Sequence, residues 1–391
     1  MIVVSVASGT SVDGLDVGVV DLTLDGDCVT AEVLDSRTEP WPDGLRERLL
    51  ALLPPAGATA AELCALDTAV GRAVGAVATA AAERAGGADL VVSPGQTVHH
   101  EIEGDRCLGT LQIGQPAWVA EATGLPVVSD LRTRDVAAGG HGAPLAGVLD
   151  TLWLAGGSGP RVALNLGGIA NVTVVRSDGT SLAWDTGPAN CLLDVAASRA
   201  SGGELSYDVD GALASRGRVL PDLLNRLLAH PHYALTPPVS TGRETFSAEY
   251  LDRMVGPEPA WEDVAATLVE LTARTVTDAL APYDVTEMVV SGGGARNPAV
   301  MAALARHLPA PVRTSDELGL PVDGKEAVLW ALLGFLTWYG VPVTTDSARS
   351  PRVLGRISPG AGPLVLPTPA DAPTRLRVRP GHDLITEACS A

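Results

Sequence analysis

The chain has 391 residues, 46% of them hydrophobic and 19% charged, and its 46 acidic and 27 basic side chains give a formal net charge of −19 at pH 7. One hydrophobic core stops growing near roughly 250–300 residues, so this length predicts two domains. Because no apolar run reaches the roughly 18–20 residues that span a bilayer, and because the negative charge repels polyanions on average, we expect a soluble protein that binds neither membranes nor nucleic acid.

The first predicted element is a hairpin at the amino terminus. A strand over Ile2 to Ala7 leads through a polar, glycine-containing tip to a second strand centred on Val17 to Leu22. The segment lacks the basic stretch and apolar run of a signal peptide, so the cytoplasm is the expected location. A second hairpin, with the turn Leu166-Gly167-Gly168, is expected over Arg161 to Val175, which suggests two related halves.

Helices and strands alternate along the rest of the chain, which is typical of the α/β class. The Pro- and Ala-rich stretch from Ala361 to Pro373 predicts a loop. The expected domains are residues 1–130 together with about 345–391, and residues 131–344. We expect helices over Leu45–Leu53, Thr59–Ala85, Glu262–Leu280, Pro298–Arg306 and Ala327–Trp338 and from about Asn190, and strands over Asp89–Ser93, Leu182–Trp184 and Met288–Ser291.

Three glycine-containing turns are candidates for nucleotide binding. Glycines let backbone N–H groups approach an anion, and the two carboxylates of the first turn would need a divalent cation between them and a phosphate. Each turn alone is also compatible with an ordinary connection. Their order, two hairpin tips and then a Gly-Gly-Gly before a helix, is that of the actin-like ATPase fold. The residues expected to bind ATP are Ser8, Gly9, Thr10, Ser11, Asp13, Gly14, Asp16, Gly167, Gly168, Gly292, Gly293 and Gly294.

The cysteines and histidines predict neither a disulfide framework nor a zinc centre. The five cysteines are scattered without a Cys-x-x-Cys spacing, so we expect free thiols. His99 and His100 are neighbours, and on an extended chain they would point in opposite directions, so both cannot bind one metal ion.

Short motifs between Ser8 and Ala327 together resemble one family, the anhydro-N-acetylmuramic acid kinases. The resemblance implies two RNase H-like domains with ATP in the cleft between them, and often a homodimer. In chain order the motifs are Ser8–Asp16, Gly95–Thr97, Thr110–Gly114, Arg134-Asp135 through Gly142–Leu145, Asn165–Asn171, Trp184–Pro188, Ser240–Glu244, Ser291–Gly294 and Glu326-Ala327.

The resemblance also implies a reaction with two linked parts. Water opens the 1,6-anhydro bridge of 1,6-anhydro-N-acetylmuramic acid at the anomeric carbon, while the γ-phosphoryl group of ATP moves to O6. The products are N-acetylmuramic acid 6-phosphate and ADP, and in bacteria this chemistry serves peptidoglycan recycling.

Two carboxylates are the main candidates for contact with the reacting sugar. Asp185 follows a short apolar strand and precedes a turn, so it could act as the base that takes a proton from the attacking water. From the residues alone, an Asx turn or a helix cap is the alternative. Similarity suggests that Glu326 touches the sugar near its anomeric centre, whereas its spacing from Asp323 also fits a capping box.

The remaining roles follow from the resemblance. Arg134 and Asp135 would contact the lactyl carboxylate or the hydroxyls of the sugar, since an arginine suits a carboxylate, although a surface ion pair is the alternative. Gln96 and Thr97 would line the same pocket. Asp13 would bind Mg²⁺ through water, because Mg²⁺ keeps several waters and takes few protein ligands.

The chain departs from the family pattern at three positions. Pro94, His141 and Val239 stand where the family usually has His, Gln and Lys. These changes leave two alternatives open: a kinase of another anhydro-sugar such as levoglucosan, and a catalytically weak ATP-binding module of the same fold.

Overall fold

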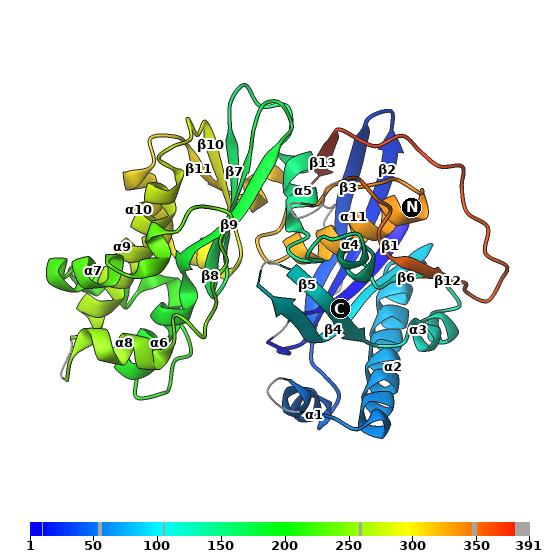
Figure 1. Cartoon of the computed structure of the whole chain (residues 1–391), viewed down its shortest axis with the longest axis horizontal. Helices are drawn as coiled ribbons and strands as arrows, with labels where there is room; N and C mark the ends of the chain where they lie inside the picture. Colours follow the sequence, from blue (N-terminus) through cyan, green and yellow to red (C-terminus); the bar gives the residue numbers. More distant parts are fainter. Residues whose placement is uncertain (10, 54–56, 105, 258–259, 346–349, 380–391) are drawn as a thin grey trace, which may run out of the picture. The chain divides into compact units, whose positions relative to one another are not determined.

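The computed structural model describes residues 1–9, 11–53, 57–104, 106–257, 260–345 and 350–379. The chain divides into two compact units. Unit 1 contains Met1–Trp153, Leu318–Leu320 and Gly324–Ala391, and unit 2 contains Leu154–Glu317 and Pro321–Asp323. Figure 1 shows that each unit has its own sheet and its own helices.

The sheet of unit 1 begins with an antiparallel meander of three strands, followed by strands that run parallel to the first one. Its strand order is β12-β6-β4-β1-β2-β3-β13, with β5 paired to β4. The strands are β1 (Ile2–Ser8), β2 (Leu15–Asp25), β3 (Cys28–Glu39), β4 (Leu90–Glu103), β5 (Arg106–Ile113), β6 (Val127–Ser129), β12 (Arg356–Ser358) and β13 (Arg375–Arg379).

Helices pack against this sheet. Alternation along β4 puts Val91 into the same buried cluster as α2, while Val92 lies within reach of Gly334 in α11, so α2 and α11 cover opposite faces. By length and composition α2 could cross a membrane, but its buried residues belong to the core of unit 1. The helices are α1 (Leu45–Leu52), α2 (Ala60–Arg84), α3 (Pro116–Thr123), α4 (Thr133–Ala137), α5 (Ala146–Trp153) and α11 (Lys325–Trp338).

Unit 2 repeats the same plan. Its sheet has the order β11-β10-β7-β8-β9, in which β7, β8 and β9 form the meander and β10 and β11 run parallel to β7. The strands are β7 (Arg161–Leu166), β8 (Ile169–Val175), β9 (Ser181–Pro188), β10 (Glu287–Ser291) and β11 (Val312–Thr314). The helices are α6 (Asn190–Ala200), α7 (Pro221–Leu228), α8 (Ala248–Val255), α9 (Trp261–Leu280) and α10 (Pro298–His307), and short 3₁₀ turns cover Val209–Gly211, Ala214–Arg216, Pro231–Ala234, Gly293–Arg296 and Ser315–Leu318.

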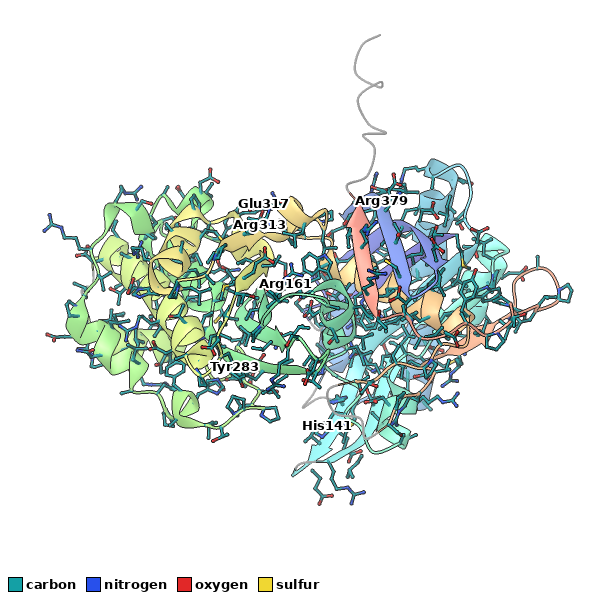
Figure 2. The ribbon with its side chains drawn as sticks, turned by 90° about the horizontal axis from the view of Figure 1, so that it is seen from above. His141, Arg161, Tyr283, Arg313, Glu317 and Arg379 are labelled. Carbon is teal, nitrogen blue, oxygen red and sulfur yellow. The ribbon has the colours of Figure 1, made fainter. Side chains whose placement is uncertain are left out.

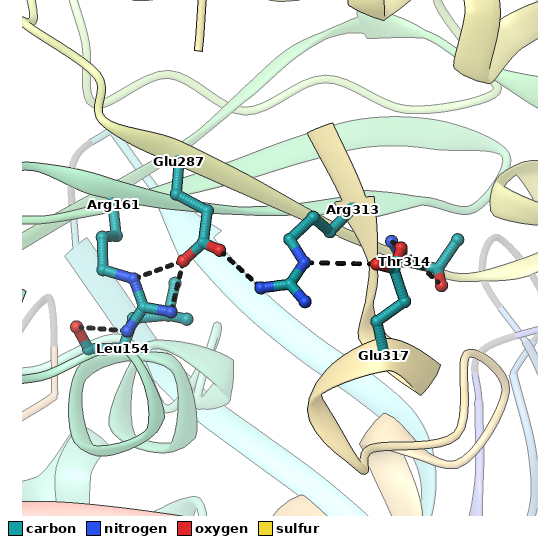
Figure 3. Close-up of polar contacts among 6 residues, drawn as sticks. All are labelled: Leu154, Arg161, Glu287, Arg313, Thr314 and Glu317. Atoms are coloured by element: carbon teal, nitrogen blue, oxygen red, sulfur yellow. Dashed lines mark hydrogen bonds and ion pairs between the residues drawn. The ribbon is translucent and has the colours of Figure 1, made fainter. Parts of the chain in front are cut away.

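A chain of ion pairs ties together the three parallel strands of unit 2. Arg161 on β7 donates to Glu287 on β10 (Nε to Oε2, 2.8 Å), and Arg313 on β11 donates to the other oxygen of Glu287 (3.3 Å). Arg313 also donates to Glu317 (3.2 Å), which accepts from the backbone N–H of Thr314 as well (2.9 Å). Figure 3 shows this row in close-up, and Figure 2 labels its members Arg161, Arg313 and Glu317. Arg161 and Glu287 are the first residues of β7 and β10, so the row lies at the opposite end of these strands from the glycine turns that follow them.

The repeated strand order confirms the expected fold class: the chain is α/β, with two RNase H-like domains. In each sheet an antiparallel meander is followed by two strands parallel to its first strand, in the order β3-β2-β1-β4-β6 and β9-β8-β7-β10-β11. The expected hairpins, α2, α9, α10, α11 and the loop before β13 are present. The four described cysteines, Cys28, Cys64, Cys107 and Cys191, are free thiols as expected, and Cys389 lies outside the described residues.

The unit boundaries differ from the expected domains, which placed residues 131–344 in the second half. In the structure α4, α5 and α11 belong to unit 1. The physical reason is packing: a Cβ added to Gly18 of β2 would lie 2.5 Å from the Cβ of Ala327, and Ser5 on β1 donates to the carbonyl oxygen of Ala327 (2.8 Å). Helix α11 therefore covers the sheet of unit 1, although it follows unit 2 in the sequence.

Candidate functional site

Side chains from two other elements hold the turn between β1 and β2. Arg46 on α1 donates from Nε to the carbonyl oxygen of Val12 (2.9 Å), and its Nη2 lies 3.3 Å from Oδ1 of Asp13. Gln96 on β4 donates to the carbonyl oxygen of Gly9 (3.2 Å). The turn is therefore fixed by α1 and β4, while 73% of the Asp13 side chain stays exposed.

The other predicted residues of this turn have different surroundings. Asp16 accepts a hydrogen bond from Thr38 on β3 (2.7 Å). A Cβ on Gly14 would lie 2.6 Å from Cγ2 of Thr38, so the close approach of β3 requires a glycine there. Ser8 is half-buried and Ser11 is exposed at the tip, and Thr10 lies outside the described residues.

Glu326 and Arg132 form one electrostatic group in unit 1. Trp330 donates from Nε1 to Oε1 of Glu326 (3.1 Å), and the guanidinium of Arg132 lies 5.2 Å from the centroid of the Trp330 ring. Burial lowers the pKa of Arg132, and the charge of Glu326 opposes this. Glu326 as a whole residue is exposed, but the protein atoms around its carboxyl desolvate it, and this raises its pKa. The negative charge of Asp16 adds to the rise in pKa, and the hydrogen bond from Trp330 opposes it. Glu326 thus lies within electrostatic reach of the first turn.

The capping-box interpretation of Glu326 is wrong. Helix α11 has Gly324 at its N-cap with no side-chain capping bond. Asp323 instead pairs with Arg296 (Oδ2 to Nε, 2.9 Å). The carboxylate of Glu326 is therefore not used to end the helix.

Thr97 belongs to a row of polar side chains on β4 and β5. Gln112 donates from Nε2 to Oγ1 of Thr97 (3.2 Å) and to Oγ1 of Thr110 (2.7 Å). Nδ1 of His100 lies 3.1 Å from the same Thr110 hydroxyl. Burial lowers the pKa of His100, and the charge of Arg132 lowers it further, so this row lies near the Arg132 group.

Of the other predicted sugar contacts, Arg134 is exposed, and the described part of the chain gives it no hydrogen-bond or ion-pair partner. Asp135 is completely buried, and its carboxylate accepts from the backbone N–H of Gly142 (2.8 Å) and from Thr345 (2.7 Å). Gln96 is also completely buried and ties β4 to Gly9. In this structure Asp135 and Gln96 organise loops, so their contact with a sugar stays a prediction.

In unit 2 the structure brings the predicted glycines together. The carbonyl oxygens of Gly167 and Gly168 accept from the backbone N–H groups of Asn190 (3.0 Å) and Ala189 (3.0 Å), so the tip of the β7–β8 hairpin sits on the start of α6. A Cβ on Gly292 would lie 2.8 Å from the carbonyl oxygen of Leu166, and one on Gly294 would lie 2.6 Å from the Cβ of Leu166. The hairpin tip and the Gly-Gly-Gly segment are therefore in contact.

A pocket of about 480 Å³ opens beside these glycines. Gly293, Asn190, Asp194, Tyr207, Arg296 and Asn297 are among its lining residues. Tyr207 is 57% exposed and offers a flat apolar surface. Burial raises the pKa of the Asp194 carboxyl to about 6, and the charge of Arg243 opposes the rise. A ring-shaped group with hydroxyls, such as a nucleoside, fits this combination of surfaces.

The carboxylate of Asp185 is held on both oxygens. Asn171, its partner on β8, donates to Oδ1 (3.0 Å), and the backbone N–H of Thr241 donates to Oδ2 (2.9 Å). The backbone N–H of Asp185 donates to the carbonyl oxygen of Val239 (2.9 Å), and Nε2 of His232 lies 3.0 Å from the carbonyl oxygen of Asp185. Helix α6 has Ala189 at its N-cap with no side-chain capping bond, so the helix-cap interpretation of Asp185 is wrong.

The loop that holds Asp185 also carries an arginine over the hairpin tip. A Cβ on Gly168 would lie 2.6 Å from Nε of Arg243, so the guanidinium lies against this glycine. Arg243 is exposed, and within the described ranges its guanidinium has no hydrogen-bond or ion-pair partner. Arg243 lies two positions after Thr241, which contacts Asp185. One loop therefore presents a free positive charge at a glycine turn and fixes a carboxylate.

The side chains that could bind a metal ion are single carboxylates that do not form a cluster among the described residues. The residues that the structure describes contain no group of three or more His, Cys, Asp or Glu side chains that could hold a metal ion. Mg²⁺ takes one or two carboxylates and completes its shell with water and substrate phosphates. The exposed carboxylate of Asp13 fits that requirement.

The amino-acid sequence is similar to proteins of one known family over most of its length. The family model described as anhydro-N-acetylmuramic acid kinase matches residues 1–360. The chain belongs to the anhydro-N-acetylmuramic acid kinase family. Relatives named anhydro-N-acetylmuramic acid kinase include those of Streptomyces avermitilis (54% identical, covering 96% of this chain and 99% of the relative), Streptomyces coelicolor (50%, covering 96% and 98%) and Rhodococcus erythropolis (46%, covering 97% and 99%).

Solved structures are more distant. A ROK family glucokinase from Streptomyces griseus, in complex with glucose and AMPPNP, is 15% identical and covers 86% of this chain and 99% of its own, with a TM-score of 0.38. Because this structural similarity is low, the fold is assigned from the strand order of the two sheets and from family membership.

Three residues that the geometry brings forward had no role in the sequence predictions: Arg132, Asn171 and Arg243. Arg132 lies two residues before Arg134, and the sequence of this short segment does not show which arginine faces Glu326. Asn171 and Arg243 fall inside recognised motifs, which was the available signal. Their partners, Asp185 and Gly168, become apparent only when β8 and the loop after α7 are placed in three dimensions.

Proposed function

We propose that the chain is an ATP-dependent kinase that opens 1,6-anhydro-N-acetylmuramic acid with water and phosphorylates it at O6. The observation that carries the proposal is the Asp185 carboxylate, whose two oxygens accept hydrogen bonds from Asn171 and from the backbone of Thr241. A carboxylate fixed in this way is suited to take a proton from a water molecule in a defined direction. Membership of the kinase family supplies the reaction class.

In the proposed reaction, Asp185 removes a proton from water as the water oxygen bonds to the anomeric carbon. The bond from the anomeric carbon to O6 breaks, and O6 takes the γ-phosphoryl group, so that ADP leaves. The phosphoryl step depends mainly on positioning and charge neutralisation. In our proposal the turn from Ser8 to Asp16 and the Gly167-Gly168 turn bind the phosphates of ATP, and Arg243 adds a positive charge.

The pocket beside Gly293 is the proposed site for adenosine, with Gly292 and Gly294 as its backbone wall. On the sugar side we propose Thr97 and Glu326, as the sequence predicts, and we add Arg132. The Arg132 guanidinium donates to the carbonyl oxygen of Gly142 (2.8 Å), lies over the Trp330 ring and interacts with the charge of Glu326, whereas Arg134 is exposed without such contacts. Arg132 is therefore the better candidate to meet the lactyl carboxylate.

A bound Mg²⁺ would neutralise phosphate charge, and we propose that Asp13 holds it through water. Removal of divalent cations with EDTA should then abolish turnover, and added Mg²⁺ should restore it. We also propose a cytoplasmic homodimer. Light scattering of the purified chain should give twice the monomer mass of 40.0 kDa.

The decisive experiment is turnover with Mg-ATP and 1,6-anhydro-N-acetylmuramic acid, followed by detection of the sugar 6-phosphate. Asp185→Asn should lower kcat by about 10²- to 10⁴-fold, the range typical of a lost general base. Asp178→Asn is the matched control, because Asp178 lies in the turn that joins β8 and β9, away from Asp185, and accepts hydrogen bonds from Thr180. Wild-type turnover by Asp185→Asn would remove Asp185 from this role, and preferential turnover of levoglucosan would replace the proposed substrate.

A further inference from the structure

His232 binds the backbone of Asp185 and has no role in the function proposed above. Nε2 of His232 lies 3.0 Å from the carbonyl oxygen of Asp185. A carbonyl oxygen can only accept a hydrogen bond, so Nε2 carries the proton and is the donor. His232 is buried, with 7% of its surface exposed. The imidazole therefore joins the proposed base to a second part of unit 2.

Asp185 lies at the outer edge of its sheet. β9 is the last strand in the order β11-β10-β7-β8-β9, so one of its sides has no neighbouring strand among the described residues. In an antiparallel strand, the N–H and C=O groups of every second residue point away from the paired strand. Those of Asp185 point to the open side, because they bond to Val239 (2.9 Å) and to His232, which lie outside β8.

One segment, residues 232–241, makes three of the hydrogen bonds that hold Asp185. His232 donates to its carbonyl oxygen, Val239 accepts from its N–H, and the backbone N–H of Thr241 donates to Oδ2. The bonds at the backbone fix the peptide groups from which the side chain extends, and the bond from Thr241 sets the direction of the carboxylate. Asn171 on β8 donates to the other oxygen. The carboxylate therefore depends on this segment as well as on the sheet.

A cavity of about 500 Å³ lies between this segment and α9. Its wall includes Trp184 and Asp185 on β9, His232, Leu235, Pro237 and Val239 on the segment, and Arg274 and Asp278 on α9. Because of this space, α9 does not support the whole length of the segment. The position of the segment relative to β9 then depends on the bonds at its two ends, and His232 provides the bond at the first end.

Neighbouring side chains hold the imidazole in place. The ring centroids of Tyr233 and Phe246 lie 5.8 Å and 6.0 Å from that of His232, both in edge-to-face arrangements. Nδ1 of His230 accepts from the backbone N–H of His232 (3.2 Å). Tyr233 itself lies against β9, since a Cβ on Gly187 would be 2.8 Å from Cε1 of Tyr233. The donor is thus fixed by packing and by a further hydrogen bond, as the support of a functional group needs to be.

We infer that His232 is a positioning residue for the reaction: its Nε2–H fixes the peptide group after Asp185 and so keeps the carboxylate directed at the attacking water. Without this bond the segment 232–241 is free to move away from β9, and Thr241 loses its hold on Oδ2. A misplaced base slows the chemical step much more than it changes substrate binding. This inference rests on the proposed function, in which Asp185 is the base, and adds a residue that determines where the base lies.

The test changes the reach of the donor and keeps its chemistry. In His232→Gln the side-chain nitrogen is the same number of bonds from Cβ as Nε2 of histidine, so it should restore the hydrogen bond and keep kcat within about twofold of the wild type. In His232→Asn the nitrogen is one bond closer to Cβ and should not reach. Its kcat should fall by about tenfold, while KM for Mg-ATP and for 1,6-anhydro-N-acetylmuramic acid stays within about twofold.

His230→Asn is the matched control, because it removes a ring from the same aromatic group, and its side-chain oxygen can still accept from the backbone N–H of His232. This variant should keep the wild-type kcat. Thermal unfolding of each variant sets an assay temperature at which all of them are folded. A loss of kcat in His230→Asn or in His232→Gln equal to that in His232→Asn would show that ring packing matters and not the donated bond, which would overturn the inference.

Hydrogen-exchange mass spectrometry gives a readout that does not need turnover. The amide N–H groups of Asp185 and Thr241 both take part in these contacts, so peptides that contain them should exchange about tenfold faster in His232→Asn and at the wild-type rate in His232→Gln. Faster exchange without a loss of kcat, or the reverse, would contradict the positioning role. If the wild type forms no sugar 6-phosphate, the proposed function fails, whereas the exchange rates still decide whether His232 holds Asp185.

Discussion

The turn after β1 and the turn after β7 occupy the same place in two sheets of the same strand order, but their charges are opposite. The first presents Asp13 and Asp16, and the nearby cation Arg46 is already bonded to the turn. The second has no acid at its tip and carries Arg243, whose guanidinium lies against Gly168. The first turn can meet a phosphate only through a cation, whereas the second can meet it directly.

The supports differ as well. Side chains from α1 and β4 hold the first turn, whereas the backbone at the start of α6 holds the second. A repeated topology therefore fixes where the two turns lie, and local residues decide what each turn can bind. Four predictions test this contrast.

The largest effect is expected at Arg243. Arg243→Ala removes the positive charge from the second turn and should lower kcat/KM for ATP by about 10- to 100-fold, the value of a charge-assisted hydrogen bond to phosphate. Arg243→Lys should recover part of the loss. Arg253→Ala, at an exposed arginine on α8, is the matched control and should behave like the wild type in steady-state kinetics. A wild-type KM for ATP in Arg243→Ala would mean that the second turn does not use this charge.

How far the sequence predicted these features depends on whether the signal was local. The sequence assigned roles to the glycine turns, Asp185 and Glu326 because each belongs to a short motif with a strand or helix beside it. Arg243 and Arg132 were not assigned, because their partners are far away in the sequence. The placement of α11 in unit 1 was missed for the same reason, since Ser5 and Gly18 contact Ala327 across more than 300 residues.

Some strands were also missed for a physical reason. β3, over Cys28–Glu39, alternates buried and half-buried residues only over its first half, and its second half carries Asp35, Arg37 and Glu39, so the hydrophobic pattern does not extend along the strand. β13 is a short edge strand, and its three exposed arginines hide the buried Leu376 and Val378. Edge strands often carry such charges, which prevent pairing with other chains.

The second prediction compares one glycine from each turn. Gly14→Ala would place a Cβ 2.6 Å from Thr38 and 2.9 Å from the carbonyl oxygen of Glu39, so it should destabilise the fold by about 1–3 kcal/mol, as overpacking does. Gly167→Ala would meet its nearest atom at 3.6 Å, an ordinary contact, and should cost less than about 0.5 kcal/mol. Urea unfolding of both variants measures the difference. Equal costs would show that β3 does not constrain the first turn.

The third prediction concerns pH and the second turn. Burial raises the pKa of Asp194 from 3.8 to about 6, so the folded state holds this proton more tightly than the unfolded state. The stabilisation is complete at low pH and is lost as pH rises through about 6. Asp194→Asn should therefore gain stability relative to the wild type between about pH 4 and pH 7, by roughly 1 kcal/mol, because solvent screens this half-buried carboxyl. A Tm difference that stays constant over this range would contradict the shift.

The smallest effect is expected at Arg46, which supports the first turn but is not expected to touch phosphate. Arg46→Ala loses the bond to Val12 and frees Asp13, so the turn should become less ordered while its acidic charge increases. Because an exposed ion pair contributes about 0–1 kcal/mol, the KM for Mg-ATP should rise by no more than about fivefold, with kcat unchanged. Arg48→Ala, on the same helix and paired with Glu62, is the control. A large loss of kcat in Arg46→Ala would mean that the first turn also uses an arginine at the phosphate, and the contrast between the two turns would disappear.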